Sequence, residues 1–159
     1  MSFTLLRATN EHKIVIAGLM QFYIYDFSEY LELDVADNGS FAPYPDLNDY
    51  WESDDVKFPY VIKEHDKYIG FALVKFISSK SRNYFSIAEF FILKRYRGKG
   101  IGRAVAISLF DLHRGQWEVF QKEQNIPAQV FWNKVISEYT KGQFTERLEN
   151  GKRIQDFEN

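Results

Sequence analysis

A short basic segment of the chain contains three glycines in a stretch of five residues. Its sequence is Arg97-Gly98-Lys99-Gly100-Ile101-Gly102-Arg103. Glycine accepts positive φ and lets the backbone come close to an anion, so successive N–H groups can turn inward toward it. A helix that begins directly behind such a loop adds further N–H groups and the positive end of its dipole. We call residues 97–103 the glycine loop and predict that they bind a pyrophosphate group. The alternative interpretation is a Gly-rich loop whose basic side chains are only solvated.

The glycine loop differs in spacing from the two commonest phosphate-binding motifs. It lacks the Gly-Lys-Ser/Thr ending of a P-loop, and no G-x-G-x-x-G follows the strand-like run before it. Other chemistry has little support in the chain, because there is no cysteine and the three histidines are dispersed. No His/Asp/Glu spacing suggests a metal site, and Ser108 lies outside a G-x-S-x-G elbow. The sequence therefore predicts neither a metal site nor a hydrolase triad.

The elements that must position the glycine loop follow from the periodicity of the chain. Residues 84–93 (YFSIAEFFIL) are typical of a strand, and Ile101, Val105 and Leu109 mark an amphipathic helix behind the loop. A further strand-like run covers residues 117–122. Since strands that are joined through a helix are usually parallel neighbours, we expect these two strands to pair in parallel.

The rest of the chain completes one domain of mixed α/β class. Its predicted strands cover residues 3–7, 58–63, 67–77, 144–149 and 152–157, and its predicted helices cover about 11–27 and 127–142. Asn150-Gly151 between the last two strands is a strong hairpin signal. Residues 34–50 are rich in Gly, Pro, Asp and Asn and predict a loop, with a helical turn at 46–51. No linker or repeat interrupts this order, so we expect residues 1–159 to form a single domain.

Length and composition exclude several classes of protein. A chain of 159 residues can bury the core of one domain, and its lack of cysteine fits a reducing cytoplasm, where we expect it to act. The net charge of −2, with both signs interspersed, argues against a nucleic-acid or membrane partner. No segment approaches the roughly 18 to 20 apolar residues that span a bilayer, and the N-terminus has no signal-peptide pattern.

The glycine loop and the order of elements together resemble a known family. Arg97-x-x-Gly100-x-Gly102 fits the Q/R-x-x-G-x-G/A pattern of motif A in the GNAT superfamily of N-acetyltransferases. In that family the pattern follows the fourth strand and opens the third helix. The resemblance covers nearly the whole chain in element order and is most specific at residues 89–112. It implies a mixed, mostly antiparallel sheet of six to seven strands, about four flanking helices and a splayed parallel pair at the CoA site.

The resemblance also implies how acetyl-CoA, as co-substrate, would be held. Free backbone groups of the strand before the loop would bind the acyl carbonyl and the pantetheine arm at Ile92 and Lys94, with Phe91 nearby. Lys94 replaces a proline that is often found at its position. The pyrophosphate would lie on N–H groups of the glycine loop, which comprises Arg97, Gly98, Lys99, Gly100, Ile101, Gly102 and Arg103.

A second motif of the family, roughly N-x-x-A-x-x-F-Y, is matched by residues 125–132 (NIPAQVFW). By this resemblance Asn125 hydrogen-bonds the pantetheine arm, and it can also cap the helix that follows. The final Tyr of the motif commonly protonates the departing CoA thiolate, and Trp132 stands there in this chain. Indole does not donate a proton usefully at neutral pH, so the group that protonates the CoA thiolate stays unassigned. Asn133 follows Trp132 and could contact the cofactor instead.

A base must take the proton of the attacking ammonium group, and Glu89 is the best candidate. Its neighbours Ala88 and Phe90 are apolar, which should raise the pKa of its carboxyl toward neutrality. The alternative is a solvated Glu on the outer face of an alternating strand. Asp26 is a second candidate base.

The acceptor should be bound by the first helix and the loop after it. Aromatic rings alternate there with carboxylates, which suits a cationic amine, and the candidate binding residues are Tyr23, Asp26, Phe27 and Tyr30. For any one of them, the alternative is an amphipathic helix with a solvated acidic end.

Two functions remain open from the sequence. The first is an N-acetyltransferase that acts on a primary amine of a small molecule or peptide by direct attack in a ternary complex. The second is a non-catalytic CoA-binding or interaction module on the same scaffold, which Trp132 keeps open. The C-terminal hairpin could supply the edge of a homodimer.

Overall fold

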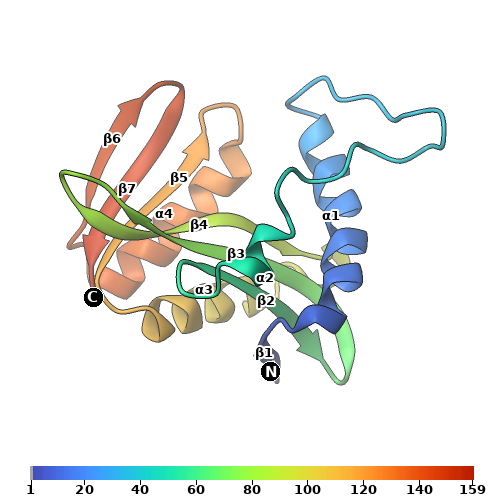
Figure 1. Ribbon diagram of the computed structural model, residues 1–159. Helices are drawn as coiled ribbons and strands as arrows, with labels where there is room; N and C mark the ends of the chain where they lie inside the picture. Colours follow the sequence, from blue (N-terminus) through green and yellow to red (C-terminus); the bar gives the residue numbers. More distant parts are fainter. Residues whose placement is uncertain (1) are drawn as a thin grey trace. The chain divides into compact units, whose positions relative to one another are not determined.

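The computed structural model describes residues 2–159 and contains a seven-stranded mixed sheet. The strands are hydrogen-bonded in the order β1-β2-β3-β4-β5-β7-β6 (Figure 1). Their bounds are Thr4–Arg7, Lys57–Glu64, Lys67–Ser78, Asn83–Ile92, Gln116–Lys122, Thr145–Glu149 and Lys152–Glu158 for β1 to β7. β1 and β2, β5 and β7, and β6 and β7 pair antiparallel, whereas β4 and β5 pair in parallel. The predicted mixed, mostly antiparallel sheet is therefore confirmed.

In residues 2–159 four α-helices accompany the sheet, as the resemblance implied. They are α1 Lys13–Ser28, α2 Asp49–Glu52, α3 Ile101–Leu112 and α4 Ile126–Thr140. Two 3₁₀ turns, Asn10–His12 and Lys94–Tyr96, precede α1 and follow β4. The first helix was expected from about residue 11, but its first turn is the 3₁₀ turn, so α1 begins at Lys13. None of the helices in residues 2–159 is long and apolar enough to cross a membrane.

The chain divides into two compact units, which we describe separately. Unit 1 comprises Met1–Leu73 and Glu89–Tyr96 and holds α1, α2, β1, β2, the beginning of β3 and the end of β4. Its core is apolar, and Ile16, Ile62, Ile69 and Phe71 are fully buried. Arg7 ties β1 to the start of β2, since its guanidinium donates to the carbonyl of Lys57 at 2.9 Å.

Unit 2 comprises Val74–Ala88 and Arg97–Asn159 and holds the rest of β3 and β4 together with all later elements. Fully buried Trp117 on β5 stacks on Phe157 of β7 with ring centroids 6.2 Å apart, and its indole N–H donates to the carbonyl of His113 at 2.9 Å. Phe110 of α3 lies edge-on to Trp117 at 4.9 Å. These rings anchor α3 on β5 and β7, and thereby fix the helix that follows the glycine loop.

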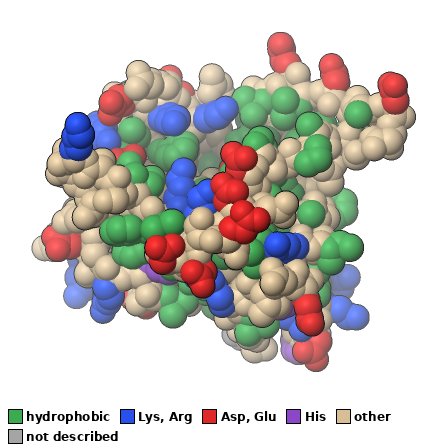
Figure 2. All heavy atoms as spheres, in the orientation of Figure 1, with side chains coloured by type: hydrophobic (Ala, Val, Ile, Leu, Met, Phe, Trp, Pro, Cys, Tyr) green, Lys and Arg blue, Asp and Glu red, His purple; other side chains and the backbone are tan. Residues whose placement is uncertain are grey.

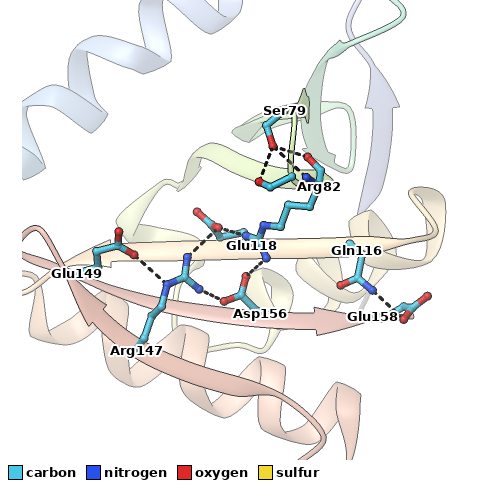
Figure 3. Close-up of polar contacts among 9 residues, drawn as sticks. Ser79, Arg82, Gln116, Glu118, Arg147, Glu149, Asp156 and Glu158 are labelled. Carbon is cyan, nitrogen blue, oxygen red and sulfur yellow. Dashed lines mark hydrogen bonds and ion pairs between the residues drawn. The ribbon is translucent and has the colours of Figure 1, made fainter.

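An ion-pair network covers one side of the strands β5, β7 and β6 in unit 2 (Figure 3). The carboxylates of Glu118 and Asp156 are each paired with both Arg82 and Arg147. Glu118 and Asp156 are register partners on β5 and β7, and their side chains are only 15% and 16% exposed. Because two cations serve two largely buried anions, the network satisfies charges that would otherwise be costly to bury.

The parallel pair β4–β5 is short. Its register contains only Phe85 opposite Trp117, whereas β5 and β7 pair over seven residues from Gln116 to Lys122. The pairing is thus confined to the beginning of each strand, and the rest of β5 is hydrogen-bonded on its β7 side. This agrees with the splayed parallel pair that the resemblance implied.

Candidate functional site

The glycine loop of unit 2 has the backbone conformation that the sequence predicts. Gly98 and Gly100 have φ values of 74° and 80°, in the left-handed region. Gly100 is the N-cap of α3, and its carbonyl accepts the first hydrogen bond of the helix, from the N–H of Ala104 at 3.0 Å. The N–H groups of Ile101, Gly102 and Arg103 therefore have no carbonyl one turn earlier within the helix. These N–H groups can donate hydrogen bonds to a bound anion.

The side chains of the glycine loop differ in their exposure to solvent. Arg97, Lys99 and Arg103 are exposed, while Ile101 is fully buried and holds the first turn of α3 in the core of unit 2. The guanidinium of Arg103 lies 2.5 Å from the carboxylate of Glu138 on α4, and this contact lowers the pKa of Glu138. Because the pair is exposed, we assign it little stabilising energy.

The two units carry opposite charge. Unit 2 contains 13 Lys and Arg and 8 Asp and Glu, a formal net charge of +5, and unit 1 contains 7 and 14, a net charge of −7. In unit 1 the segment 14–56 holds ten carboxylates and no Lys, Arg or His. Figure 2 shows some of these carboxylates exposed at the upper right, where Figure 1 places the loop after α1. Unit 2 therefore favours an anionic ligand and unit 1 a cationic one.

Glu89, the predicted base, lies near the end of β4 in unit 1 and accepts hydrogen bonds from two phenols. The hydroxyl of Tyr23 on α1 donates to its Oε2, in a very short contact, and that of Tyr44 donates to its Oε1 at 2.9 Å. The side chain is half-buried, so it is not simply a solvated surface Glu. Each oxygen of the carboxylate thus has a phenol as its donor.

Three of the predicted acceptor residues, on α1 and directly after it, form a chain of ring contacts that begins at Tyr23, which donates to this carboxylate. The Tyr23 ring lies 4.7 Å from that of Phe27 and 5.8 Å from that of Phe91, and Phe27 is 6.4 Å from Tyr30. The carboxylate of Asp26 lies 3.4 Å from the ammonium of Lys94. The structure thus places Tyr23 in contact with Glu89, with Phe27 and Tyr30 following through ring contacts, and it places Asp26 in an ion pair.

The tyrosines near Glu89 remain protonated well beyond neutral pH. Burial is the main cause that raises the pKa of Tyr23 far above its ordinary value, and the negative charge of Glu89 adds to it. The pKa of Tyr44 and that of Tyr50 are raised by the same two causes, again with burial first. These phenols are therefore hydrogen-bond donors at neutral pH.

Sequence reasoning missed Tyr44. It lies in the segment between α1 and α2, which was predicted only as a loop, and 45 residues separate it from Glu89. No local pattern marks such a contact. Gly70 was missed as well, although an isolated glycine inside a strand does indicate a close approach of two backbones. A Cβ on Gly70 would overlap the carbonyl oxygen of Phe91 and lie 3.2 Å from the Cα of Ile92.

The residues expected to hold the cofactor at the end of β4 are well fixed in unit 1. Phe91 and Ile92 are buried, and the N–H of Leu93 donates to the carbonyl of Ile69 on β3 at 2.8 Å. Lys94 is exposed and begins the 3₁₀ turn that leads to the glycine loop. The roles that the resemblance implies for Phe91, Ile92 and Lys94 use backbone atoms, and these positions lie at the end of β4 and directly after it.

Three candidate residues lie on α4 or at its start, in unit 2. Asn125 is the N-cap, and its side-chain oxygen accepts the N–H of Ala128 at 3.2 Å, which leaves its amide N–H₂ group for a different partner. Trp132 is buried, with its ring 5.0 Å from that of Phe131 and 6.4 Å from that of Phe110. Asn133 lines a hollow of about 500 Å³ together with Val130 and Arg153.

The described part of the chain has no cluster of side chains that could bind a metal ion. Residues 2–159 contain no group of three or more His, Cys, Asp or Glu side chains that could hold a metal ion. In unit 1 the carboxylate of Glu89 is instead hydrogen-bonded by two phenols, those of Tyr23 and Tyr44.

Comparisons with known proteins point to one family. The model of a family described as acetyltransferase (GNAT) family matches residues 22–136. Among solved structures, the PaiA N-acetyltransferase of Thermoplasma acidophilum in complex with coenzyme A has a TM-score of 0.68 at 10% identity, with all of both chains covered. An acetyltransferase of Thermus thermophilus has a TM-score of 0.65 at 13% identity, with 100% of this chain and 98% of that chain covered.

A third similar structure holds a bisubstrate analogue. Arabidopsis thaliana Naa50, in complex with CoA-Ac-MVNAL, has a TM-score of 0.61 at 12% identity, with all of both chains covered. At such identities these likenesses show a shared fold. None of the curated proteins compared with the chain matches it.

Proposed function

Because the chain belongs to the acetyltransferase (GNAT) family, we propose that it moves an acetyl group from acetyl-CoA to a primary amine of a small molecule or peptide. The observation that carries the proposal is the glycine loop, where Gly98 and Gly100 adopt positive φ directly before the first turn of α3. A pyrophosphate is the anion that such a run of N–H groups fits best. The net charge of +5 on unit 2 supports the same ligand.

The cofactor is proposed to bind through backbone atoms at consecutive parts of the chain. The pyrophosphate takes the N–H groups of residues 97–103, and the acyl carbonyl and pantetheine arm take backbone groups at Phe91, Ile92 and Lys94. The amide of Asn125 is available to the pantetheine arm while its oxygen caps α4. Trp132 and Asn133 complete the proposed set of cofactor residues on α4.

The reaction is proposed to proceed by direct attack of the amine on the thioester in a ternary complex. Glu89 takes the proton of the ammonium group, which frees the nitrogen lone pair, and the nitrogen then forms a bond to the acyl carbon. The carbon–sulfur bond breaks and its electron pair leaves with the sulfur of CoA, while the nitrogen loses its second proton as the amide forms and the thiolate takes up a proton, directly or through water. Tyr23 and Tyr44 support this role of Glu89, because two hydrogen bonds fix its carboxylate. Asp26, the second candidate base, is paired with Lys94 and is the weaker choice.

The acceptor is proposed to be a cationic amine that binds beside Glu89 in unit 1. The rings of Tyr23, Phe27 and Tyr30 offer aromatic faces to a cation. The net charge of −7 on unit 1 raises the local concentration of cations and their rate of encounter.

Thermal melting with acetyl-CoA, CoA and ATP, followed by thiol release with a panel of amines, tests the proposal. We expect stabilisation by the two CoA species and not by ATP, and thiol release that depends on an amine. Stabilisation without thiol release for any amine would support the non-catalytic CoA-binding module instead. Glu89→Gln should reduce turnover at least a hundredfold while CoA affinity is kept. Glu64→Gln, at the end of β2, is the matched control and should leave turnover unchanged.

A further inference from the structure

The segment that carries Tyr44 has little regular structure of its own, yet its position is well defined by hydrogen bonds to α1. Between Glu29 and Asn48 the described chain forms turns and bends, without a helix or a strand. Gln21 on α1 clamps this segment through both ends of its side-chain amide. Its Oε1 accepts the N–H of Phe41 at 2.9 Å, and its Nε2 donates to the carbonyl of the same residue at 3.2 Å.

This clamp resembles one rung of an antiparallel ladder, with a side-chain amide in place of a second backbone. Both polar groups of Phe41 are satisfied by one residue, so the main chain is fixed in position and in orientation at that point. Tyr44 follows three residues later and reaches Oε1 of Glu89 at 2.9 Å. The clamp is part-buried, where a hydrogen bond competes less with water than at the surface.

The two phenols that hold Glu89 therefore differ in how they are fixed. Tyr23 is carried by α1 and packed against the rings of Phe27, Phe71 and Phe91. Tyr44 belongs to an irregular segment, and the paired hydrogen bonds of Gln21 are its nearest tie to α1 along the chain. Loss of the clamp would release Tyr44 while Tyr23 stays in place.

We propose that Gln21 is a positioning residue for the transfer reaction, which acts by holding the segment at Phe41 so that Tyr44 fixes one oxygen of Glu89. The inference rests on the proposed function for the role of Glu89. The side-chain amide of Gln21 is bonded to the backbone of Phe41, so its effect on the carboxylate passes through Tyr44. With the clamp closed, both oxygens of the base have a fixed donor, so the carboxylate keeps one orientation toward the amine.

A double-mutant cycle on kcat tests the inference. Tyr44→Phe removes one hydrogen bond to the base and should lower kcat about tenfold, since a hydrogen bond to a charged group is worth roughly that factor or more. Gln21→Met keeps the length of the side chain, loses both contacts to Phe41 and should lower kcat by about three- to tenfold. The double variant should be no slower than Tyr44→Phe alone, because both changes remove the same contact. Tyr25→Phe, at an exposed position of α1, is the matched control and should leave kcat unchanged.

The pH profile separates this role from a merely structural one. Without the phenol, the ionised carboxylate is less favoured, so the acid limb of the kcat/KM profile should move to higher pH in Tyr44→Phe and in Gln21→Met. KM for acetyl-CoA should stay unchanged in both. Multiplicative losses in the double variant, full kcat in Gln21→Met, or an acid limb that stays in place would each overturn the inference.

A measurement without turnover keeps the inference testable if no amine supports thiol release. With 3-fluorotyrosine incorporated, the 19F resonance of Tyr44 is assigned by its absence in Tyr44→Phe, at neutral pH where the phenol is protonated. In Gln21→Met this resonance should move toward the position of a solvated tyrosine because Tyr44 is released, whereas that of Tyr23 should stay in place. An unchanged Tyr44 resonance would show that Gln21 does not hold Tyr44, whatever the reaction of the chain.

Discussion

Gly70 on β3 lies so close to Phe91 on β4 that a methyl group at Gly70 would overlap the carbonyl oxygen of Phe91. The same methyl group would lie 3.0 Å from Cδ1 of Ile92 and 3.2 Å from its Cα. The backbone between Phe91 and Ile92 can therefore lie this close to β3 only because residue 70 has no side chain. These are the residues whose backbone groups we propose to hold the acyl end of acetyl-CoA.

Gly70→Ala should consequently displace this part of β4. A backbone carbonyl cannot rotate away as a side chain can, so we expect a loss of about 1–3 kcal/mol in the free energy of unfolding. The kcat/KM for acetyl-CoA should fall by more than the unfolded fraction explains. Urea unfolding and thiol-release kinetics measure the two effects.

Gly18→Ala is the matched control for this substitution. Gly18 lies in the exposed middle of α1, and a Cβ there would meet no atom within 4 Å. Since alanine is the better helix former, this variant should gain roughly 0.5–1 kcal/mol. Equal effects of the two alanines would contradict the close approach at Phe91.

Most of the regular structure could be predicted because it depends on local pattern. Apolar positions at Ile101, Val105 and Leu109 indicate α3, and the strand-like runs at 84–93 and 117–122 correspond to β4 and β5. Positive φ at Gly98 and Gly100 was likewise a local expectation, since glycine is the residue that accepts it at least cost.

The surroundings of Glu89 could not be predicted in the same way. The sequence shows its neighbours along β4, which are apolar, but the groups that contact its carboxylate come from α1 and from a loop. Only Tyr23 could be named, because the helix pattern of α1 marked a cluster of rings. Tyr44 and its clamp at Gln21 depend on the path of an irregular segment, and no periodicity describes that path.

The ion-pair network of unit 2 predicts unequal effects of two similar substitutions. Glu118 and Glu149 both pair with Arg147, but their side chains are 15% and 55% exposed. Glu118→Gln leaves Arg82 and Arg147 with one carboxylate fewer in a partly buried place, so we expect a cost of about 1–3 kcal/mol. Glu149→Gln should cost less than about 0.5 kcal/mol. Chemical denaturation of the two variants at low salt measures the difference, and equal costs would contradict the burial argument.

The buried tyrosines predict a loss of stability at alkaline pH. Burial raises the pKa of Tyr23, Tyr44 and Tyr50 above the ordinary value of 10.0, with the charge of Glu89 as the next cause. A raised pKa means that the folded state favours the protonated phenol. The resulting stability is complete below pH 10 and is lost as the pH rises from there toward the folded-state values.

The free energy of unfolding should therefore fall steeply above about pH 10. Unfolding in urea between pH 8 and pH 11.5 measures this slope. Tyr44→Phe should make the slope shallower, because one delayed ionisation is removed, and Tyr25→Phe should not, since Tyr25 is exposed. A flat dependence in the unaltered chain would contradict the assigned burial of these phenols.

Gly98 gives the sharpest test of the glycine loop. A Cβ at this position would meet no atom within 4 Å, so a substitution meets no steric barrier from neighbours, but the φ of 74° is unfavourable for most side chains. In Gly98→Ala it costs roughly 1–2 kcal/mol to keep the left-handed conformation that presents the N–H groups. We therefore expect a five- to thirtyfold loss of CoA affinity by calorimetry, together with a lower melting temperature.

Gly98→Asn separates backbone conformation from bulk at the same position. Asparagine tolerates the left-handed region better than alanine although its side chain is larger. Affinity for CoA should consequently be weaker than in the unaltered chain but stronger than in Gly98→Ala. The opposite order, with asparagine weakening CoA binding more than alanine does, would contradict this explanation. The loss of affinity would then come from the size of the side chain and not from the φ angle of residue 98.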